Sequence, residues 1–146
     1  MFGEGWPLKI LNVGACVVLG LFVLNNLLRG GVHVFAADGG AATAAGLDLA
    51  ASEGVIVSLF AAIGAMQMVV GGFELFVLAR RRDLVTIALG VQAALSVTGV
   101  LVLQVWKPLP LPQTIATVSL LLAGLAVAGW IAAMTAARRA PVWVRA

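Results

Sequence analysis

The stretch from Gly54 to Asp83 constrains the fold of this chain more than any other part of the sequence. It contains the apolar run VIVSLFAAIGAMQMVVGGFELFVLA, which is closed by three consecutive arginines and Asp83. A helix that crosses a bilayer needs about 20 consecutive, mostly apolar residues, so this run is long enough. It also carries Glu74, the only acidic side chain inside an apolar run. The stretch therefore predicts a membrane span that ends in a dense positive cluster.

Composition extends this prediction to the whole chain. Hydrophobic residues make up 62% of the sequence and charged residues 10%, whereas about 25% of the residues in soluble domains are charged. The mean hydropathy is +1.11. A chain of 146 residues can hold only a few spans, so we expect residues 1–146 to form a single integral membrane domain. Its one cysteine, Cys16, excludes an intrachain disulfide and a metal site built from cysteines.

The apolar runs divide the chain into four predicted spans. Pro7 suits the first turn of a helix, where its missing N–H would be unpaired in any case. The four-residue RRRD turn forces the second and third spans into an antiparallel hairpin, and alternating prolines from Pro108 to Pro112 end the third span. We therefore predict an all-α polytopic membrane protein, a four-transmembrane-helix antiparallel bundle. Its spans cover approximately residues 7–28, 54–79, 84–105 and 114–137.

The connection from Arg29 to Glu53 is rich in Gly and Ala and too weakly apolar to span a membrane. It is long for a structureless connection, so we expect a short helical segment on the outer surface between the first two spans. Asp48 is a candidate cap for a turn that leads into the second span. His33, the only histidine, is placed in this loop with partial exposure. A haem or metal site there is disfavoured, because the chain has no second histidine.

The distribution of basic residues predicts the orientation. Arg29 and Lys107 lie on one side of the predicted bundle, and the other seven Lys and Arg residues, Arg145 among them, lie on the opposite side. The positive-inside rule then places the N- and C-termini in the cytoplasm, and we expect a bacterial inner membrane. Because seven of the nine basic residues fall where topology puts them, nucleic-acid binding is excluded as an explanation of the net charge of +3. The predicted interface anchors are Trp6, Trp106, Arg80, Arg81 and Arg82.

One face of the second span is small and polar, whereas its other faces carry Val, Leu, Met and Phe. In lipid such a face turns inward, because small residues let helices approach and polar groups find partners across the interface. A packed seam is the favoured interpretation. The other is a polar cavity, or a proton or ligand site, centred on Gln67 and Glu74. The stripe consists of Phe60, Gly64, Gln67, Gly71, Glu74 and Leu78.

Helix geometry predicts partners for this stripe on the third span. Glu74 lies about 9 Å below the basic turn and Gln92 about 12 Å below it, at 1.5 Å per residue. Because side chains lean toward the N-terminus of their helix, we expect these two to meet. The same register places Gln67 opposite Ser96 and Gly99. Desolvation favours a protonated Glu74 and a nearby arginine an ionised one, so its charge stays open.

Two adjacent amides, Asn25 and Asn26, lie near the end of the first span, and they must point to different faces. One interpretation is that one of them faces a neighbouring helix. The other is that both reach toward the membrane interface.

Part of this pattern resembles a known group of proteins. The residues Gly46, Leu47, Asp48, Gln67, Gly71, Gly72, Glu74 and the turn Arg80 to Arg82 resemble small bacterial four-helix inner-membrane proteins of the DoxX-like type, over the middle of the chain. The resemblance implies a four-helix inner-membrane bundle. Some DoxX relatives are subunits of membrane redox complexes that pass electrons to quinone.

The sequence contains no trio of nucleophile, base and orienting residue, and no phosphate-binding loop, so we do not expect an enzyme. The leading hypothesis is a non-catalytic accessory subunit of a larger inner-membrane complex. The alternative is a small oligomeric transporter, or a lipid- or quinone-binding protein, that uses Gln67, Glu74, Gln92 and Ser96. Expected partners are the lipid bilayer and other membrane subunits or further copies of the chain. No cofactor is predicted, although a bound lipid or quinone is compatible with the pattern.

Overall fold

A computed structural model describes residues 6–50, 52–109 and 111–139. This part of the chain is built from helices and contains no strand. A short 3₁₀ turn, η1, joins the second helix to the third, and the third helix continues into a π-helical end, η2. The elements are α1 (Trp6–Phe35), α2 (Glu53–Arg80), η1 (Arg82–Leu84), α3 (Val85–Val100), η2 (Leu101–Trp106) and α4 (Gln113–Arg139).

Within the described ranges, four helical segments are long and apolar enough to cross a membrane, which confirms the predicted all-α four-helix membrane fold. The second and fourth spans agree with prediction to within two residues at either end. The third begins at η1 and continues through η2. The spans are Leu8–Phe35, Glu53–Arg80, Arg82–Trp106 and Gln113–Arg139.

The first helix is longer than predicted, because α1 continues through residues 29–35. The glycines after Arg29 suggest the start of a loop from the sequence alone. In the structure, Gly30 is instead a point of close packing: a Cβ atom added to it would lie 2.7 Å from the carbonyl oxygen of Gly64 on α2. Arg29 and His33 therefore belong to α1, and the prediction that His33 lies in the loop is wrong.

The segment after α1, residues 36–50, forms hydrogen-bonded turns rather than the predicted short surface helix; we call it the cap loop. Its glycines prevent a helix, since Gly39, Gly40 and Gly46 have φ values of 60°, 75° and 67°. Asp48 accepts a hydrogen bond from the N–H of Ala50 at 2.9 Å, so it stabilises a turn inside the cap loop and not the first turn of α2.

Asp38 stabilises the first part of the cap loop. One carboxylate oxygen accepts from the N–H of Gly40 at 2.9 Å and the other from the N–H of Thr43 at 2.8 Å. These backbone hydrogen bonds, that of Thr43 first, lower the pKa of Asp38 from 3.8 to about 2.

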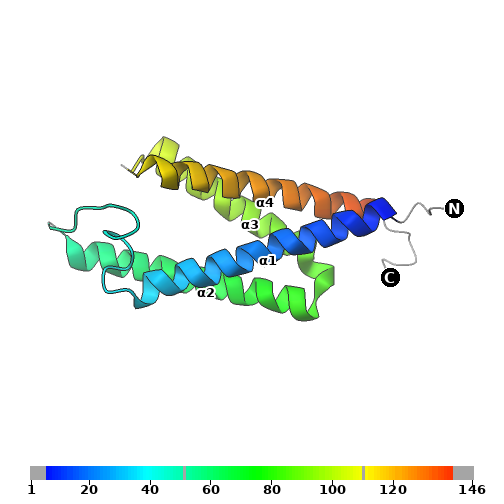
Figure 1. The fold of residues 1–146 in the computed structure, drawn as a ribbon, viewed down its shortest axis with the longest axis horizontal. Coiled ribbons are helices and arrows are strands. Elements are labelled where there is room, and N and C mark those ends of the chain that lie inside the picture. The colour runs from blue at the N-terminus through cyan, green and yellow to red at the C-terminus, as the bar shows by residue number, and fades with distance from the viewer. Residues whose placement is uncertain (1–5, 51, 110, 140–146) are drawn as a thin grey trace.

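The helices are arranged as two antiparallel pairs, α1 with α2 and α3 with α4, and these pairs have the most extensive contacts. Figure 1 shows that the pairs come together where α2 turns into α3 and diverge toward the opposite end. We call these the turn end and the loop end. The core near the turn end joins all four helices through residues such as Leu19, Val77, Leu89 and Ala133. The gradual separation leaves the loop-end half of α2 beside α1 and the cap loop, away from α3 and α4.

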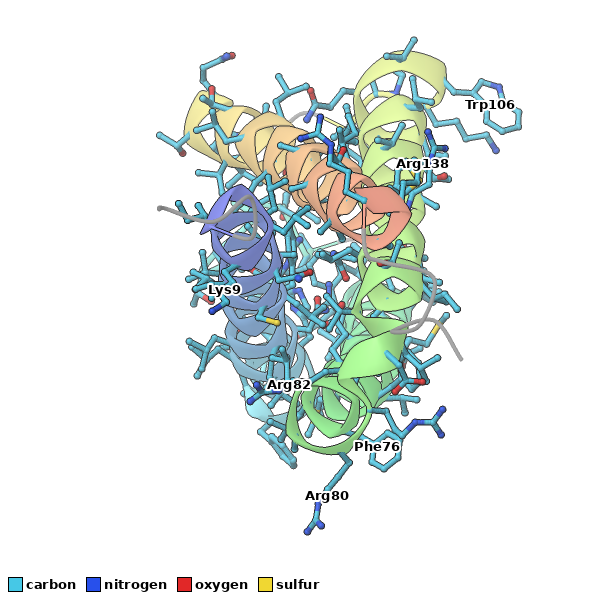
Figure 2. All side chains as sticks on the ribbon, turned by 90° about the vertical axis from the view of Figure 1, so that its right-hand side faces the viewer. Lys9, Phe76, Arg80, Arg82, Trp106 and Arg138 are labelled. Carbon is cyan, nitrogen blue, oxygen red and sulfur yellow. The ribbon has the colours of Figure 1, made fainter. Side chains whose placement is uncertain are left out.

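The turn end carries a group of cations. Lys9, Arg80, Arg82 and Arg138 lie toward the viewer in Figure 2, which looks at the molecule from that side. Trp106 and Lys107 lie at the opposite end of the third span. The charge asymmetry used for the orientation prediction is therefore present among the described residues, whereas Arg145 lies outside them.

Candidate functional site

The polar stripe of α2 faces α1, and glycines make this close approach possible. A Cβ atom added to Gly64 would lie 2.5 Å from the Cβ of His33, and one added to Gly71 would lie 3.1 Å from the Cβ of Asn26. Gly64, Gly71 and Glu74 are buried, which confirms that the stripe turns inward. Its main neighbour is α1, whereas the sequence argument assigned that place to α3.

Asn26 links three helices through one side-chain amide. Its Nδ2 donates to Glu74 Oε2 on α2 at 2.9 Å and to Gln92 Oε1 on α3 at 3.1 Å. Gln92 Nε2 in turn donates to Ser96 Oγ at 3.1 Å. Asn26, Glu74 and Gln92 are all buried. We call Asn26, Glu74, Gln92 and Ser96 the polar junction.

The polar junction corrects one prediction and confirms another. Glu74 and Gln92 do lie at the same level, but Asn26 stands between them and supplies the hydrogen bonds expected between the two directly. One of the two adjacent asparagines does face neighbouring helices, as one interpretation held. The helical register of α1 distinguishes Asn26 from Asn25. Asn26 continues the buried face formed by Ala15, Leu19 and Phe22.

Gln67 does not join this network. Within the described residues its side chain makes no hydrogen bond, and its Oε1 atom is buried without a donor. The predicted pairing of Gln67 with Ser96 is not formed, because Ser96 accepts from Gln92 instead and α2 diverges from α3 toward the loop end. Gln67 is half-buried and lies near the middle of the 28-residue helix α2.

Glu74 is bonded through one oxygen only. Asn26 binds Oε2, whereas Oε1 is buried and has no partner among the described residues. The side chain is 1% exposed, and no ion pair in the described part of the chain includes it. An ionisable group held in this way inside a span is costly, so it is a candidate for function.

His33 is buried, which corrects the expectation of partial exposure. Its Nδ1 lies 2.6 Å from the carbonyl oxygen of Gly39 in the cap loop, and its Nε2 lies 3.3 Å from Nε of Arg29. A carbonyl oxygen only accepts and a guanidinium N–H only donates, so the geometry requires a neutral ring protonated on Nδ1. Its ring also meets Phe60 of α2 edge to face, with 5.1 Å between ring centroids.

Both ring nitrogens of His33 are therefore engaged by the protein itself. In addition, no group of three or more His, Cys, Asp or Glu residues within the described ranges is placed to hold a metal ion. The structure thus gives no support to a metal or haem site at His33.

The predicted interface anchors lie at the two ends of the spans. Trp106 is 76% exposed, and the Lys107 ammonium lies 5.9 Å from its ring centroid. At the turn end, Arg81 pairs with Asp83 at 2.8 Å, and this carboxylate raises the pKa of Arg81. Arg82 Nε donates to the carbonyl of Leu78 at 3.2 Å, and Arg80 extends away from the bundle (Figure 2). Trp6 begins α1, but its side chain is outside the described part.

No protein-family model, curated protein sequence or solved structure matches this chain. The resemblance to DoxX-like proteins therefore stays a prediction. Two polar groups of α2, Gln67 Oε1 and Glu74 Oε1, are buried without a partner among the described residues.

Proposed function

We propose that this protein is a non-catalytic accessory subunit of a larger assembly in the bacterial inner membrane. The observation that carries the proposal is Gln67, an amide that makes no hydrogen bond to any described residue and lies in the middle of a candidate membrane span. Hydrocarbon offers no donor or acceptor, so an unpaired amide at this depth costs free energy. Its Oε1 is enclosed by the described residues, so a polar side chain on a helix of another membrane protein would pair with the other end of the amide, by accepting from Nε2.

The packing of α2 leaves room for such a partner. Only 11% of the most apolar stretch of this span is buried, compared with 28% for the first span. Toward the loop end, α2 packs on α1 and on the cap loop near Gly39, whereas α3 and α4 have diverged from it. Lipid alone would cover an apolar face of this kind, but it would leave Gln67 unpaired. The amide therefore favours a protein partner over lipid.

Purification from native membranes tests this proposal. The tagged full chain, isolated in mild detergent, should retain a different membrane protein in fixed ratio. Gln67→Leu should weaken that association about 3- to 20-fold, because interhelical hydrogen bonds average about 0.6 kcal/mol and reach about 1.7. Met66→Leu is the matched control, since this neighbour is 70% exposed and apolar; it should leave the association unchanged. Recovery of self-oligomers alone, or equal retention by Gln67→Leu, would contradict the proposal.

The orientation belongs to the same proposal, with both termini in the cytoplasm. The cations at the turn end support it through the positive-inside rule. Topology reporters fused after Ala146 and inserted near Ala41 should report opposite sides of the membrane. Equal reports from the two positions would overturn the four-span topology.

A second candidate function, a small oligomeric transporter, is favoured by the unpaired oxygen of Glu74. A carboxyl group that carries a proton or cation must gain and lose it, which Gln cannot do. In this case Glu74→Gln would be expressed normally but would abolish proton flux into vesicles under an imposed pH gradient. The subunit proposal predicts no flux for either form. The other form of this second candidate is a protein that binds a lipid or a quinone at the polar junction.

A further inference from the structure

From the length of α1, we place Arg29 near the depth of the lipid head groups on the loop side. It follows Lys9 by 20 positions on one continuous helix, which corresponds to about 30 Å along the axis, the thickness of a hydrocarbon core. Lys9 lies at the turn end (Figure 2), so Arg29 marks the opposite boundary. Its side chain is exposed, and the anionic groups of phospholipids lie in the head-group layer at this level.

The positive charge of Arg29 has no acidic partner in the described part of the chain. The nearest acids in sequence accept hydrogen bonds from the cap loop backbone instead. Asp38 accepts from the N–H groups of Gly40 and Thr43, and Asp48 accepts from that of Ala50. The side-chain partner of Arg29 is His33, which is neutral in the tautomer that its contacts require. The charge is thus held in place without being neutralised.

His33 gives the guanidinium a fixed orientation. Its ring is buried between α1 and α2, held by the Gly39 carbonyl through Nδ1 and by Phe60 edge to face. From this position Nε2 accepts from Nε of Arg29, which leaves both terminal amino groups of the guanidinium available. A fork that presents these two groups is the geometry that binds phosphate oxygens.

We propose that Arg29 binds the phosphate group of a phospholipid in the leaflet at the loop end, with His33 as its positioning residue. The site goes beyond the subunit proposal, because it lies on α1 and needs no partner protein. A lipid bound to Arg29 would be connected to the cap loop through the contacts of His33 with Arg29 and with the Gly39 carbonyl.

Native mass spectrometry of the delipidated full chain tests the site. The protein is titrated with phosphatidylglycerol and phosphatidylcholine, which both carry phosphate, and with diacylglycerol, which does not. One phospholipid of either kind should bind in preference to diacylglycerol. Arg29→Gln should weaken this binding about fivefold, since one basic residue near a membrane surface contributes about 1 kcal/mol. Lys107→Gln removes the other loop-end cation and should have a smaller effect.

His33→Asn separates positioning from folding. The Asn Nδ2 can take the place of Nδ1 and donate to the Gly39 carbonyl, but the shorter side chain puts no acceptor at the position of Nε2. Phospholipid binding, measured at a temperature at which the lipid-free melting curve shows the variant folded, should therefore weaken. Phospholipid binding by Arg29→Gln at the wild-type level would overturn the proposal. Equal losses in Arg29→Gln and Lys107→Gln, or retention of diacylglycerol as strong as that of phospholipid, would also overturn it. Displacement of the lipid by millimolar inorganic phosphate would overturn the assignment to lipid.

Discussion

Asn26 supplies the side-chain hydrogen bonds that connect α1 to both α2 and α3 in the polar junction. Both hydrogens of its amide are used, one by Glu74 and one by Gln92. Asn26→Leu would leave two buried acceptor oxygens without donors, so we expect a loss of about 1 to 3 kcal/mol in the free energy of unfolding. Asn25→Leu is the matched control, since Asn25 is half-buried and makes no hydrogen bond within the described residues. Unfolding in detergent should separate the two variants, and equal effects would exclude the role of Asn26.

Glu74 offers a second test at this scale. Glu74→Gln keeps an oxygen that accepts from Asn26, so the variant should fold with nearly wild-type stability. Glu74→Leu removes that acceptor and should lower the free energy of unfolding by about 0.6 kcal/mol, and not above about 2. Thermal unfolding of the three proteins in detergent measures both effects. Severe destabilisation by Glu74→Gln would show that the charge itself is paired.

The pH dependence of the cap loop follows from Asp38. Its pKa is lowered from 3.8 to about 2, so its stabilising contribution is present above about 3.8 and is lost as the pH falls through about 2. Hydrogen exchange at the Gly40 and Thr43 amides, corrected for its intrinsic pH dependence, should show constant protection from pH 8 to pH 4. Asp38→Asn should lower protection at both amides across that range. A loss of protection in the wild type near pH 6 would implicate another group.

At the scale of the helices, α1 and α2 pack closely because glycines at their contact leave no side chains between the two backbones. A Cβ at Gly64 would lie 2.5 Å from His33 Cβ and 2.8 Å from the Gly30 carbonyl oxygen. Gly64→Ala should therefore force the helices apart and cost about 1 to 3 kcal/mol. At Gly72 of the same helix nothing lies within 4 Å of an added Cβ, so Gly72→Ala should be neutral or stabilise by up to about 1 kcal/mol. The opposite order in thermal unfolding would exclude this packing.

The helices themselves were largely predictable, because length and apolar character define a membrane span directly. The end of α1 was not predictable, because a glycine such as Gly30 is equally compatible with a close helix–helix contact and with the start of a loop. The absence of a helix in residues 36–50 depends on the positive φ values of Gly39, Gly40 and Gly46, which an Ala- and Gly-rich composition does not reveal.

At the scale of the whole molecule, the divergence of the two helix pairs could not be read from the sequence. The short turn at Arg81 predicted that α2 and α3 pack along their length, and Ser96 was therefore assigned to Gln67. In the structure, α1 takes the place beside α2 because Gly64 and Gly71 admit it. The face of α2 near Glu74 was predictable from its polar stripe, but the identity of the neighbouring helix was not.

The central claim is that the middle of α2 contacts another membrane protein. The direct measurement is photocrosslinking in native membranes, with benzoylphenylalanine at Ile63, one turn from Gln67 on the same face. The matched control places it at Leu120 on α4, because the two positions are 50% and 52% exposed. We expect an adduct with a different membrane protein from Ile63 and lipid adducts alone from Leu120. The same products from both positions, or an Ile63 adduct that contains only lipid or a second copy of this chain, would contradict the proposed function.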